Sequence, residues 1–308
     1  EGKPDLFKYG PVWAILLAPL ASIPASVAPF FWAVLNAACF WAAVFAFKKE
    51  RTLTVLETSL LFPLVLANGF YGQINSLLLW LIVLMLGGMR SERPLRGGIA
   101  GAAAIWMKIF PAALLIFALN KPRRLRFWTG LLLGLLSGAL IPLLHWGPWI
   151  FESWLKVLQH DLAAPHHKLG LMALLIQSGM TEGSARVINQ WAAAIAFLGV
   201  AWAVLGQIRV RSRDQLEALL ITCFLIFSHM TEPPTLALLA PAAIVASRHD
   251  INRALPLALL LLVLPSDLTP EALKVLLGGN YGIKTLALLY AAFLLAFTRD
   301  PGLTKSPG

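Results

Sequence analysis

The chain contains three long runs without a charged residue, at residues 27–47, 127–151 and 187–208. A transmembrane helix needs about 20 mostly apolar residues to cross ~30 Å of hydrocarbon, so each run is long enough to span a membrane. Hydrophobic residues make up 58% of the sequence and charged residues only 13%, which is too apolar for a soluble domain of 308 residues. The sequence therefore predicts an all-α fold, a polytopic transmembrane protein of about ten helices forming one domain over residues 1–308. Shorter apolar runs are 53–67, 74–89, 218–230, 233–247, 254–265 and 285–298. Tilt, thinning of the bilayer or burial against neighbours lets the longer of these cross.

Lysines and arginines cluster between the apolar runs, and they account for the formal net charge of +10. In a membrane protein such clusters mark cytoplasmic loops, so we do not interpret the charge as a nucleic-acid site. The expected cytoplasmic clusters are 48–51, 90–96, 121–126, 209–213 and 248–253. The loops that alternate with them, expected outside, are 1–10, 68–73, 152–186, 228–233 and 266–283. Cys39 and Cys223 both lie inside apolar runs, so the sequence implies neither a disulfide framework nor a metal cluster.

Two segments fit the alternation only as partial helices. The clusters 90–96 and 121–126 are both strongly basic, yet a single apolar run, 97–119, separates them. We favour a re-entrant hairpin that turns near Lys108 and Pro111, over an ordinary span in which Lys108 snorkels to the interface. Residues 9–24 are short for a span and bracketed by prolines, which indicates a partial or re-entrant helix that starts outside.

Polar side chains that are costly in hydrocarbon gather on the expected outer side. Ionisable groups at membrane depth are functional-site hypotheses by default, because burying them is expensive. The residues are Lys8, Tyr9, Asn68, Tyr71, Gln73, Asn75, Lys108, His145, Asp161, His229 and Glu232.

Each of these residues also has a purely structural interpretation. Gln73 and Asn75 can cap a helix or bond a neighbouring helix, and Glu232 can be a carboxylate favoured by a helix N-terminus. His145 beside two tryptophans is typical of an interfacial belt. Outside this set, Glu57 is expected to snorkel from a cytoplasmic end. The histidines at 160, 166 and 167 have no compact metal-ligand spacing, so no metal is expected.

Five segments, in order, resemble the membrane glycosyltransferases of family 87. "FKYGPVWAILLAPLASIP" (7–24) is similar to their F-K-Y-x-P…L-x-x-P segment, "GQINSLLLWLIVL" (72–84) to G-Q-x-N-x-x-L, and "WMKIFPAALLIF" (106–117) to their K-x-x-P helix. "SWLKVLQHDLAAPHHKLGLMALL" resembles the outer-loop segment of one branch. "HMTEPPTLALLAPAAIVA" resembles that branch's E-S-P-T-Y motif, with Pro233 in place of serine and Leu236 in place of tyrosine. The resemblance covers about residues 7–247.

The resemblance implies a GT-C fold and a polyprenyl-phosphate sugar donor, often of mannose, used in an inverting transfer. The expected partners are that donor, a lipid-linked or envelope glycan acceptor and membrane lipids; no cofactor and no nucleic acid are expected. The protein would be a multi-pass protein of the cell (inner or plasma) membrane, with its active face extracytoplasmic. Lys8 and Lys108 would bind phosphate, Tyr9, Gln73 and Asn75 would contact sugar, and His229 and Glu232 would line the sugar or acceptor pocket.

In the family the catalytic base is an aspartate upstream of the F-K-Y segment, and this chain has no matching region. We therefore expect that the first spans are missing and that the present chain is inactive by itself. The identity of the base stays open, with Asp5 and Glu232 as candidates. An alternative from another class is a polytopic transporter or lipid-carrier flippase, since broken helices and buried ionisable residues are typical of both.

Overall fold

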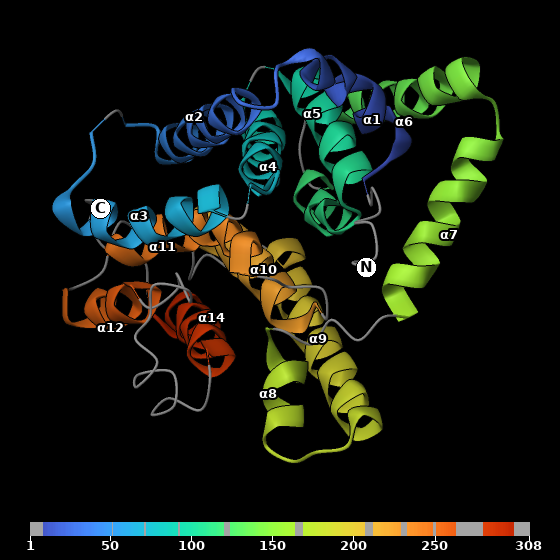
Figure 1. Ribbon diagram of the computed structural model, residues 1–308. Coiled ribbons are helices and arrows are strands. Elements are labelled where there is room, and N and C mark those ends of the chain that lie inside the picture. Colours follow the sequence, from blue (N-terminus) through green and yellow to red (C-terminus); the bar gives the residue numbers. More distant parts are fainter. Residues whose placement is uncertain are drawn as a thin grey trace. The chain divides into compact units, whose positions relative to one another are not determined.

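Helices form all the regular secondary structure in the residues that the computed structural model describes (Figure 1). Those residues are 9–50, 52–70, 72–91, 93–119, 124–163, 169–206, 212–228, 233–248, 251–262 and 280–298. The chain divides into two compact units. The first unit comprises Glu1–Leu35 and Leu77–Pro165, and the second comprises Asn36–Ser76 and His166–Gly308.

Three helices are long and apolar enough to cross a membrane: α2 (Ala28–Lys48), α6 (Arg124–Trp146) and α9 (Glu182–Leu205). They confirm the three spans expected from the sequence. The shorter helices are α1 (Pro11–Leu17), η1 (Ala18–Ser22), α3 (Val55–Phe70), α4 (Asn75–Arg90), α5 (Pro94–Met107), η2 (Phe110–Ala118), α7 (Trp149–Ala163), α8 (Leu171–Gln177), α10 (Arg213–Phe227), η3 (Pro233–Leu239), α11 (Ala240–Ser247), α12 (Ile251–Leu262) and α14 (Asn280–Phe297).

The end of the second span differs from the prediction. The apolar run extends to residue 151, but α6 ends at Trp146 because Gly147 adopts a positive φ of +80°, a conformation that favours glycine. Pro148 follows, and Figure 1 shows α7 leaving the end of α6 in a new direction. The segment 152–186, expected as a loop, accordingly contains most of α7, all of α8 and the start of α9.

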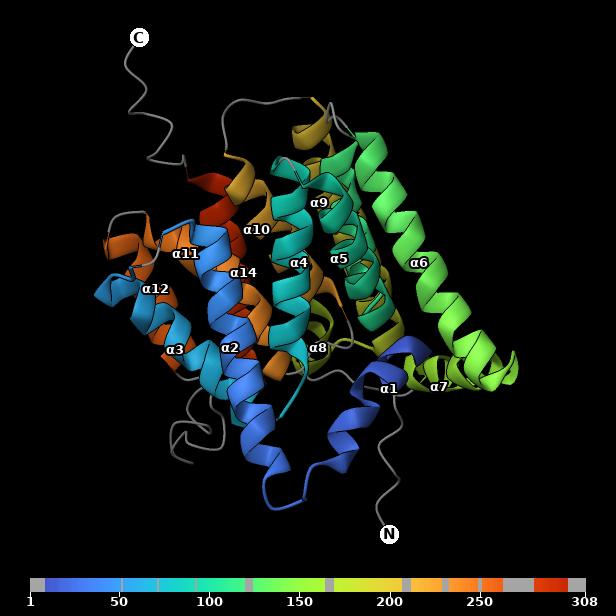
Figure 2. The ribbon, with the colours of Figure 1, turned by 90° about the horizontal axis from the view of Figure 1, so that it is seen from above.

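In the first unit, α5 and α6 pack closely through glycines (Figure 2). A Cβ added to Gly98 would lie 2.1 Å from the carbonyl oxygen of Phe127, and one added to Gly130 would lie 2.2 Å from that of Leu95. Small residues let two helix backbones approach closely, which is the common way to pack helices in a membrane.

The order of these contacts shows that α5 and α6 are parallel. Leu95 meets Gly130, Ala102 meets Gly134 and Trp106 meets Gly138, so residue numbers rise together along both helices. The chain between Met107 and Arg124 therefore returns to the end at which α5 began. The nine residues of η2 span about 18 Å at ~2.0 Å per residue, comparable with about 21 Å for the 14 residues of α5.

The hairpin prediction for 97–119 is thus confirmed in its geometry. Helix α5 ends at Met107, and Lys108 is extended, with φ −147° and ψ 140°. Helix α5 begins at Pro94, inside the basic cluster 90–96, and α6 begins at Arg124, inside the cluster 121–126, at the same end of the pair. The segment 9–24 likewise consists of two short helices, α1 and η1, rather than a full span.

The glycine packing gives a direct prediction for stability. Gly98→Ala should destabilise the protein by about 1–3 kcal/mol, because the added methyl meets backbone atoms of Phe127 and Leu131 that cannot rotate away. Gly199→Ala is the matched control, since an added Cβ there meets nothing within 4 Å. The control should be neutral or slightly stabilising in thermal unfolding of the detergent-solubilised protein. Equal shifts for the two variants would contradict the close approach of α5 and α6.

In the second unit, α10 contacts α9, α11 and α14, while α12 contacts α3 and α14. A buried amide joins two of these helices: Gln215 Nε2 donates to the carbonyl oxygens of Leu295, at 2.8 Å, and Thr298, at 2.7 Å. These carbonyls belong to the last turn of α14 and its end, where a helix cannot satisfy them itself. The amide of Gln215 therefore ties the start of α10 to the end of α14.

Candidate functional site

The segment at Tyr9 and the segment at Lys108 meet in the first unit. The main-chain N–H of Gly10 donates to the carbonyl oxygen of Trp106 at 2.8 Å. Trp13 Nε1 donates to the carbonyl oxygen of Ala103 at 3.1 Å, which fixes α1 against the last turns of α5. A Cβ at Gly10 would lie 2.5 Å from the Trp106 oxygen, so only glycine allows this approach. Two motifs about 100 residues apart are joined here by a main-chain hydrogen bond.

Trp106 is the residue on which four helices converge. Its Nε1 donates to the carbonyl oxygen of Leu135 on α6 at 3.2 Å. Its ring centroid lies 6.3 Å from that of Phe151 and 5.8 Å from that of Trp154, both on α7. Together with the Gly10 bond, these contacts hold α1, α5, α6 and α7 around the C-terminal end of α5.

Lys108 follows Trp106 by two residues and is the C-cap residue of α5. Its main-chain N–H closes the last turn of α5 by donating to the carbonyl oxygen of Ala104 at 2.9 Å, after which the backbone is extended. The side chain is half-buried. A cation at a helix C-terminus is favoured by the unsatisfied carbonyls there. Lys108 therefore presents a positive charge at the end of α5 opposite the basic segments.

Gln73 and Asn75 belong to the second unit, where they lie in the connection between α3 and α4. Gly72 has a positive φ of +59° and its N–H donates to the carbonyl oxygen of Gly69 at 3.2 Å, which turns the chain. Gln73 follows the turn and is half-buried, while Asn75 begins α4 and is fully buried.

The other predicted site residues lie outside the described residues. They are Asp5, Lys8, His229 and Glu232. The described chain stops at Ser228, just after α10, and resumes at Pro233, which begins η3. Of the two predicted phosphate ligands, the structure thus describes Lys108.

His145 fits the interfacial interpretation. It is exposed, and its ring packs edge-on against Trp146 with centroids 4.9 Å apart. Within the described ranges, no group of three or more His, Cys, Asp or Glu side chains is placed to hold a metal ion.

A buried polar cluster around Asn68 is a feature that sequence reasoning identified only in part. Asn68 Nδ2 donates to Asn36 Oδ1 at 3.2 Å and to Ser76 Oγ at 2.8 Å, and all three side chains are buried. The sequence predicts Asn68 among the polar residues of the outer side, but it does not predict the partners of Asn68. The available signal was Asn36, a lone amide in the apolar run 27–47.

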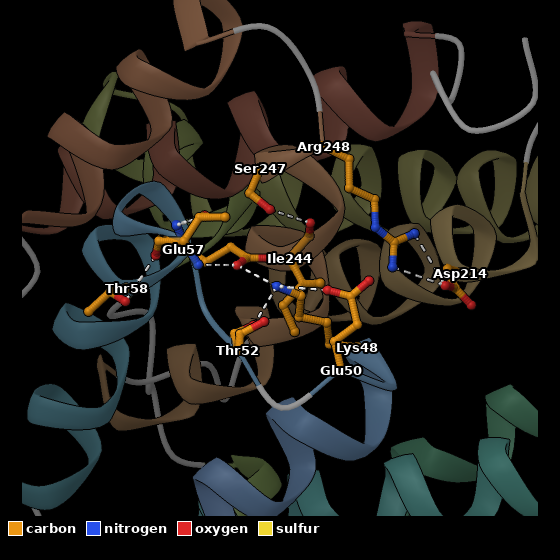
Figure 3. A network of polar contacts seen from close by, with 10 residues as sticks. Lys48, Glu50, Thr52, Glu57, Thr58, Asp214, Ile244, Ser247 and Arg248 are labelled. Atoms are coloured by element: carbon orange, nitrogen blue, oxygen red, sulfur yellow. Dashed lines mark hydrogen bonds and ion pairs between the residues drawn. The ribbon is translucent and has the colours of Figure 1, made fainter. Parts of the chain in front are cut away.

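The expectation for Glu57 is wrong. The carboxylate does not snorkel; it is buried and lies 2.6 Å from Lys48 Nζ (Figure 3). The signal was the spacing of Thr54 and Glu57 just ahead of an apolar run, which is typical of a capping box. The two bonds of that motif are present: Thr54 N–H donates to Glu57 Oε2 at 2.7 Å, and Glu57 N–H donates to Thr54 Oγ1 at 3.2 Å.

These features define the class of the protein: a multi-pass, all-helical membrane protein with helices that break at polar segments. Residues 7–233 match the sequence profile of glycosyltransferase family 87. The chain therefore belongs to glycosyltransferase family 87. No curated protein matches the chain. No solved structure matches it either.

Proposed function

We propose that the protein transfers a sugar, mannose or another hexose, from a polyprenyl phosphate to a lipid-linked or envelope glycan acceptor on the extracytoplasmic face of the cell membrane. The observation that carries this proposal is the junction at Trp106. There the Tyr9 segment is bonded to the end of α5, next to the half-buried cation of Lys108. A phosphate leaving group needs such a cation, and a site at a helix break beside apolar helices suits a prenyl tail.

The chemistry is an inverting displacement at the anomeric carbon. The acceptor oxygen forms a bond to that carbon as the bond from the carbon to the phosphate oxygen breaks. The polyprenyl phosphate leaves with the electron pair, and a carboxylate takes the proton from the acceptor hydroxyl. Charge develops on the phosphate as it leaves, so a fixed cation accelerates the step by binding the transition state more tightly than the ground state.

The chain's residues divide between these roles in our proposal. Lys108 and Lys8 bind the phosphate, while Tyr9, Gln73 and Asn75 contact the sugar. His229 and Glu232 line the sugar or acceptor pocket. The proton acceptor is Asp5, Glu232 or a carboxylate from elsewhere in the protein, and the assay below can be repeated with each carboxylate replaced.

The test uses the full protein in proteoliposomes that contain radiolabelled polyprenyl-phosphate mannose or glucose and an envelope lipid extract. We expect label to move from the donor into a new lipid-linked or glycan product. Nucleotide sugars should give no product. Transfer from nucleotide sugars alone, or movement of the labelled carrier across the bilayer without transfer, would overturn the proposal.

The proposed orientation, with the active face outside the cell, can be tested by labelling cysteines from either side of the membrane. Cysteines placed at Gly69, Ala164 and Ser228, in a variant lacking Cys39 and Cys223, should react with a membrane-impermeant thiol reagent in intact cells. A cysteine at Ser91, which is exposed in the connection between α4 and α5, should react only after the membrane is permeabilised. Reaction of Ser91→Cys alone in intact cells would reverse the orientation.

A further inference from the structure

We propose that Asn68 is a positioning residue for sugar transfer, which holds the α3–α4 turn so that Gln73 meets the donor sugar. The inference rests on the proposed function, because it assumes that Gln73 contacts the sugar. Asn68 itself is fully buried and therefore acts through the turn.

The amide of Asn68 bonds two residues of neighbouring helices, and all three residues belong to the second unit. Its Nδ2 group donates to Asn36 Oδ1 on α2, at 3.2 Å, and to Ser76 Oγ on α4, at 2.8 Å, while Asn68 itself lies on α3. Both N–H bonds of one side chain are used, one for each neighbouring helix. The three side chains are each at most 3% exposed, so water does not compete for these bonds.

The bond to Ser76 closes the base of the turn that carries Gln73. Helix α3 ends at Phe70 and α4 begins at Asn75, so Asn68 and Ser76 lie on the two sides of the connection. Between them the backbone turns at Gly72, whose φ of +59° and bond to the Gly69 carbonyl set its direction. Gln73 follows directly. The hydrogen bond between Asn68 and Ser76 therefore fixes the position of the Gln73 backbone, from which the half-buried side chain extends.

The chemistry of the bonds requires an amide and not merely a polar group. Asn68 acts as a donor to both partners, and its Oδ1 accepts no hydrogen bond from the residues that the structure describes. Aspartate has the same shape but no N–H, so Asn68→Asp removes both donations without changing the volume of the side chain, and it leaves Asn36 Oδ1 facing a carboxylate oxygen. The turn would then be held less firmly to α2 and α4.

A double-mutant cycle separates positioning from simple stability. We expect Asn68→Asp to lower kcat/KM for the polyprenyl-phosphate sugar by about 10- to 100-fold per folded molecule, since a displacement near 1 Å has effects of this order. Gln73→Ala should cause a loss of similar order. Because Asn68 acts through Gln73, the double variant should be no worse than Gln73→Ala alone.

The matched control is Gln215→Glu. Gln215 is also a fully buried amide in the second unit, and its Nε2 also donates twice between helices, to Leu295 and Thr298. The control also removes two N–H donations and adds a buried acid, but at the start of α10, where both partners are carbonyl oxygens. It should lower thermal stability while leaving kcat/KM per folded molecule within about twofold of the parent protein, because Gln215 adjoins the basic cluster 209–213, which the sequence predicts on the side of the membrane opposite Gln73.

A milder variant keeps the test independent of folding. Ser76→Ala removes only the acceptor on α4 and introduces no charge. It should lower kcat/KM in the same direction by several-fold, and this effect should also disappear in the Gln73→Ala background.

The outcomes distinguish the two proposals. Suppose that Gln73→Ala lowers kcat/KM, but Asn68→Asp and Ser76→Ala either have no effect or lower kcat/KM further in the Gln73→Ala background. Asn68 is then not a positioning residue for Gln73, and the proposed function stands. If Gln73→Ala leaves kcat/KM unchanged while the polyprenyl-phosphate sugar is still used, Gln73 does not contact the donor and the inference falls with that assignment. A protein that uses no polyprenyl-phosphate sugar in any variant overturns the proposed function itself.

Discussion

Glu57→Ala is expected to destabilise the protein by about 3 kcal/mol, because it removes the nearest carboxylate from the largely buried side chain of Lys48. Lys48 Nζ lies 2.6 Å from Glu57 Oε2, and the two side chains are only 10% and 6% exposed. Removing one partner of a buried pair typically costs about 3–5 kcal/mol. We place the cost at the lower end because Lys48 keeps the carbonyl oxygen of Thr52, at 2.7 Å, and Glu50, at 3.3 Å.

The size of this effect follows from what the pair connects. Lys48 is the last residue of α2 and Glu57 lies in the first turn of α3, so the pair joins two helix ends (Figure 3). Glu57 also accepts the N–H of Thr54, one of the donors that a helix N-terminus leaves unsatisfied. One carboxylate therefore closes the connection between α2 and α3 and caps α3 as well.

Two variants serve as controls in the same thermal unfolding experiment. Glu182→Ala breaks a pair of similar length, 2.8 Å to Arg186, whose side chains are 52% and 61% exposed. An exposed pair contributes about 0–1 kcal/mol, so this variant should shift the transition little. Lys48→Met with Glu57→Leu removes both charges and should recover most of the stability lost in Glu57→Ala. Equal shifts for Glu57→Ala and Glu182→Ala would show that the Lys48 pair is not buried from solvent.

The turn at Lys108 could be predicted from the sequence because two independent signals agreed. Basic clusters on both sides of 97–119 required an even number of crossings, and Pro111 marked where a helix cannot continue. The structure adds the glycines that make the arrangement possible, since parallel α5 and α6 need the backbone of Gly98 to lie against that of Phe127. That pairing depends on which glycines face each other, which charge and hydropathy patterns do not encode.

The errors arose where one residue overrides a hydropathy pattern. Residues 127–151 are apolar throughout, but the positive φ of Gly147 ends α6 and starts α7. Glu57 is expected to snorkel because it lies near a cytoplasmic end, but its pairing with Lys48 depends on a connection whose geometry the sequence does not specify. Both cases show that helix ends depend on local backbone and capping bonds more than on average polarity.

The sequence predicted which residues belong to the candidate site, but not the contacts that bring their segments together. Sequence patterns selected Tyr9 and Lys108 as polar groups of the same face, and the structure places their segments together through the bond from Gly10 to Trp106. Trp106 is not among the predicted site residues, and an aromatic residue in an apolar run is most often part of the core. Its role depends on contacts to α6 and α7 that join distant parts of the chain.

Lys108→Met is expected to lower the rate of sugar transfer by about 30- to 1,000-fold, equivalent to about 2–4 kcal/mol of transition-state stabilisation. The prediction rests on the proposed function, in which Lys108 stabilises the phosphate as it leaves. Methionine keeps most of the length of the lysine stem, so contacts of the half-buried side chain are largely retained. Because the charge on the phosphate grows in the transition state, kcat should fall more than the KM for the donor rises.

The comparison that decides this prediction is Lys156→Met. Lys156 is an exposed lysine on α7, and removing it changes the net charge of the protein by the same amount. It should leave transfer within about twofold, since an exposed cation is screened by water and salt. Lys108→Arg should retain more activity than Lys108→Met, because it keeps the charge but changes the geometry of the donors. If Lys108→Met and Lys156→Met transfer sugar equally well while both remain folded, the leaving phosphate is not held at the end of α5.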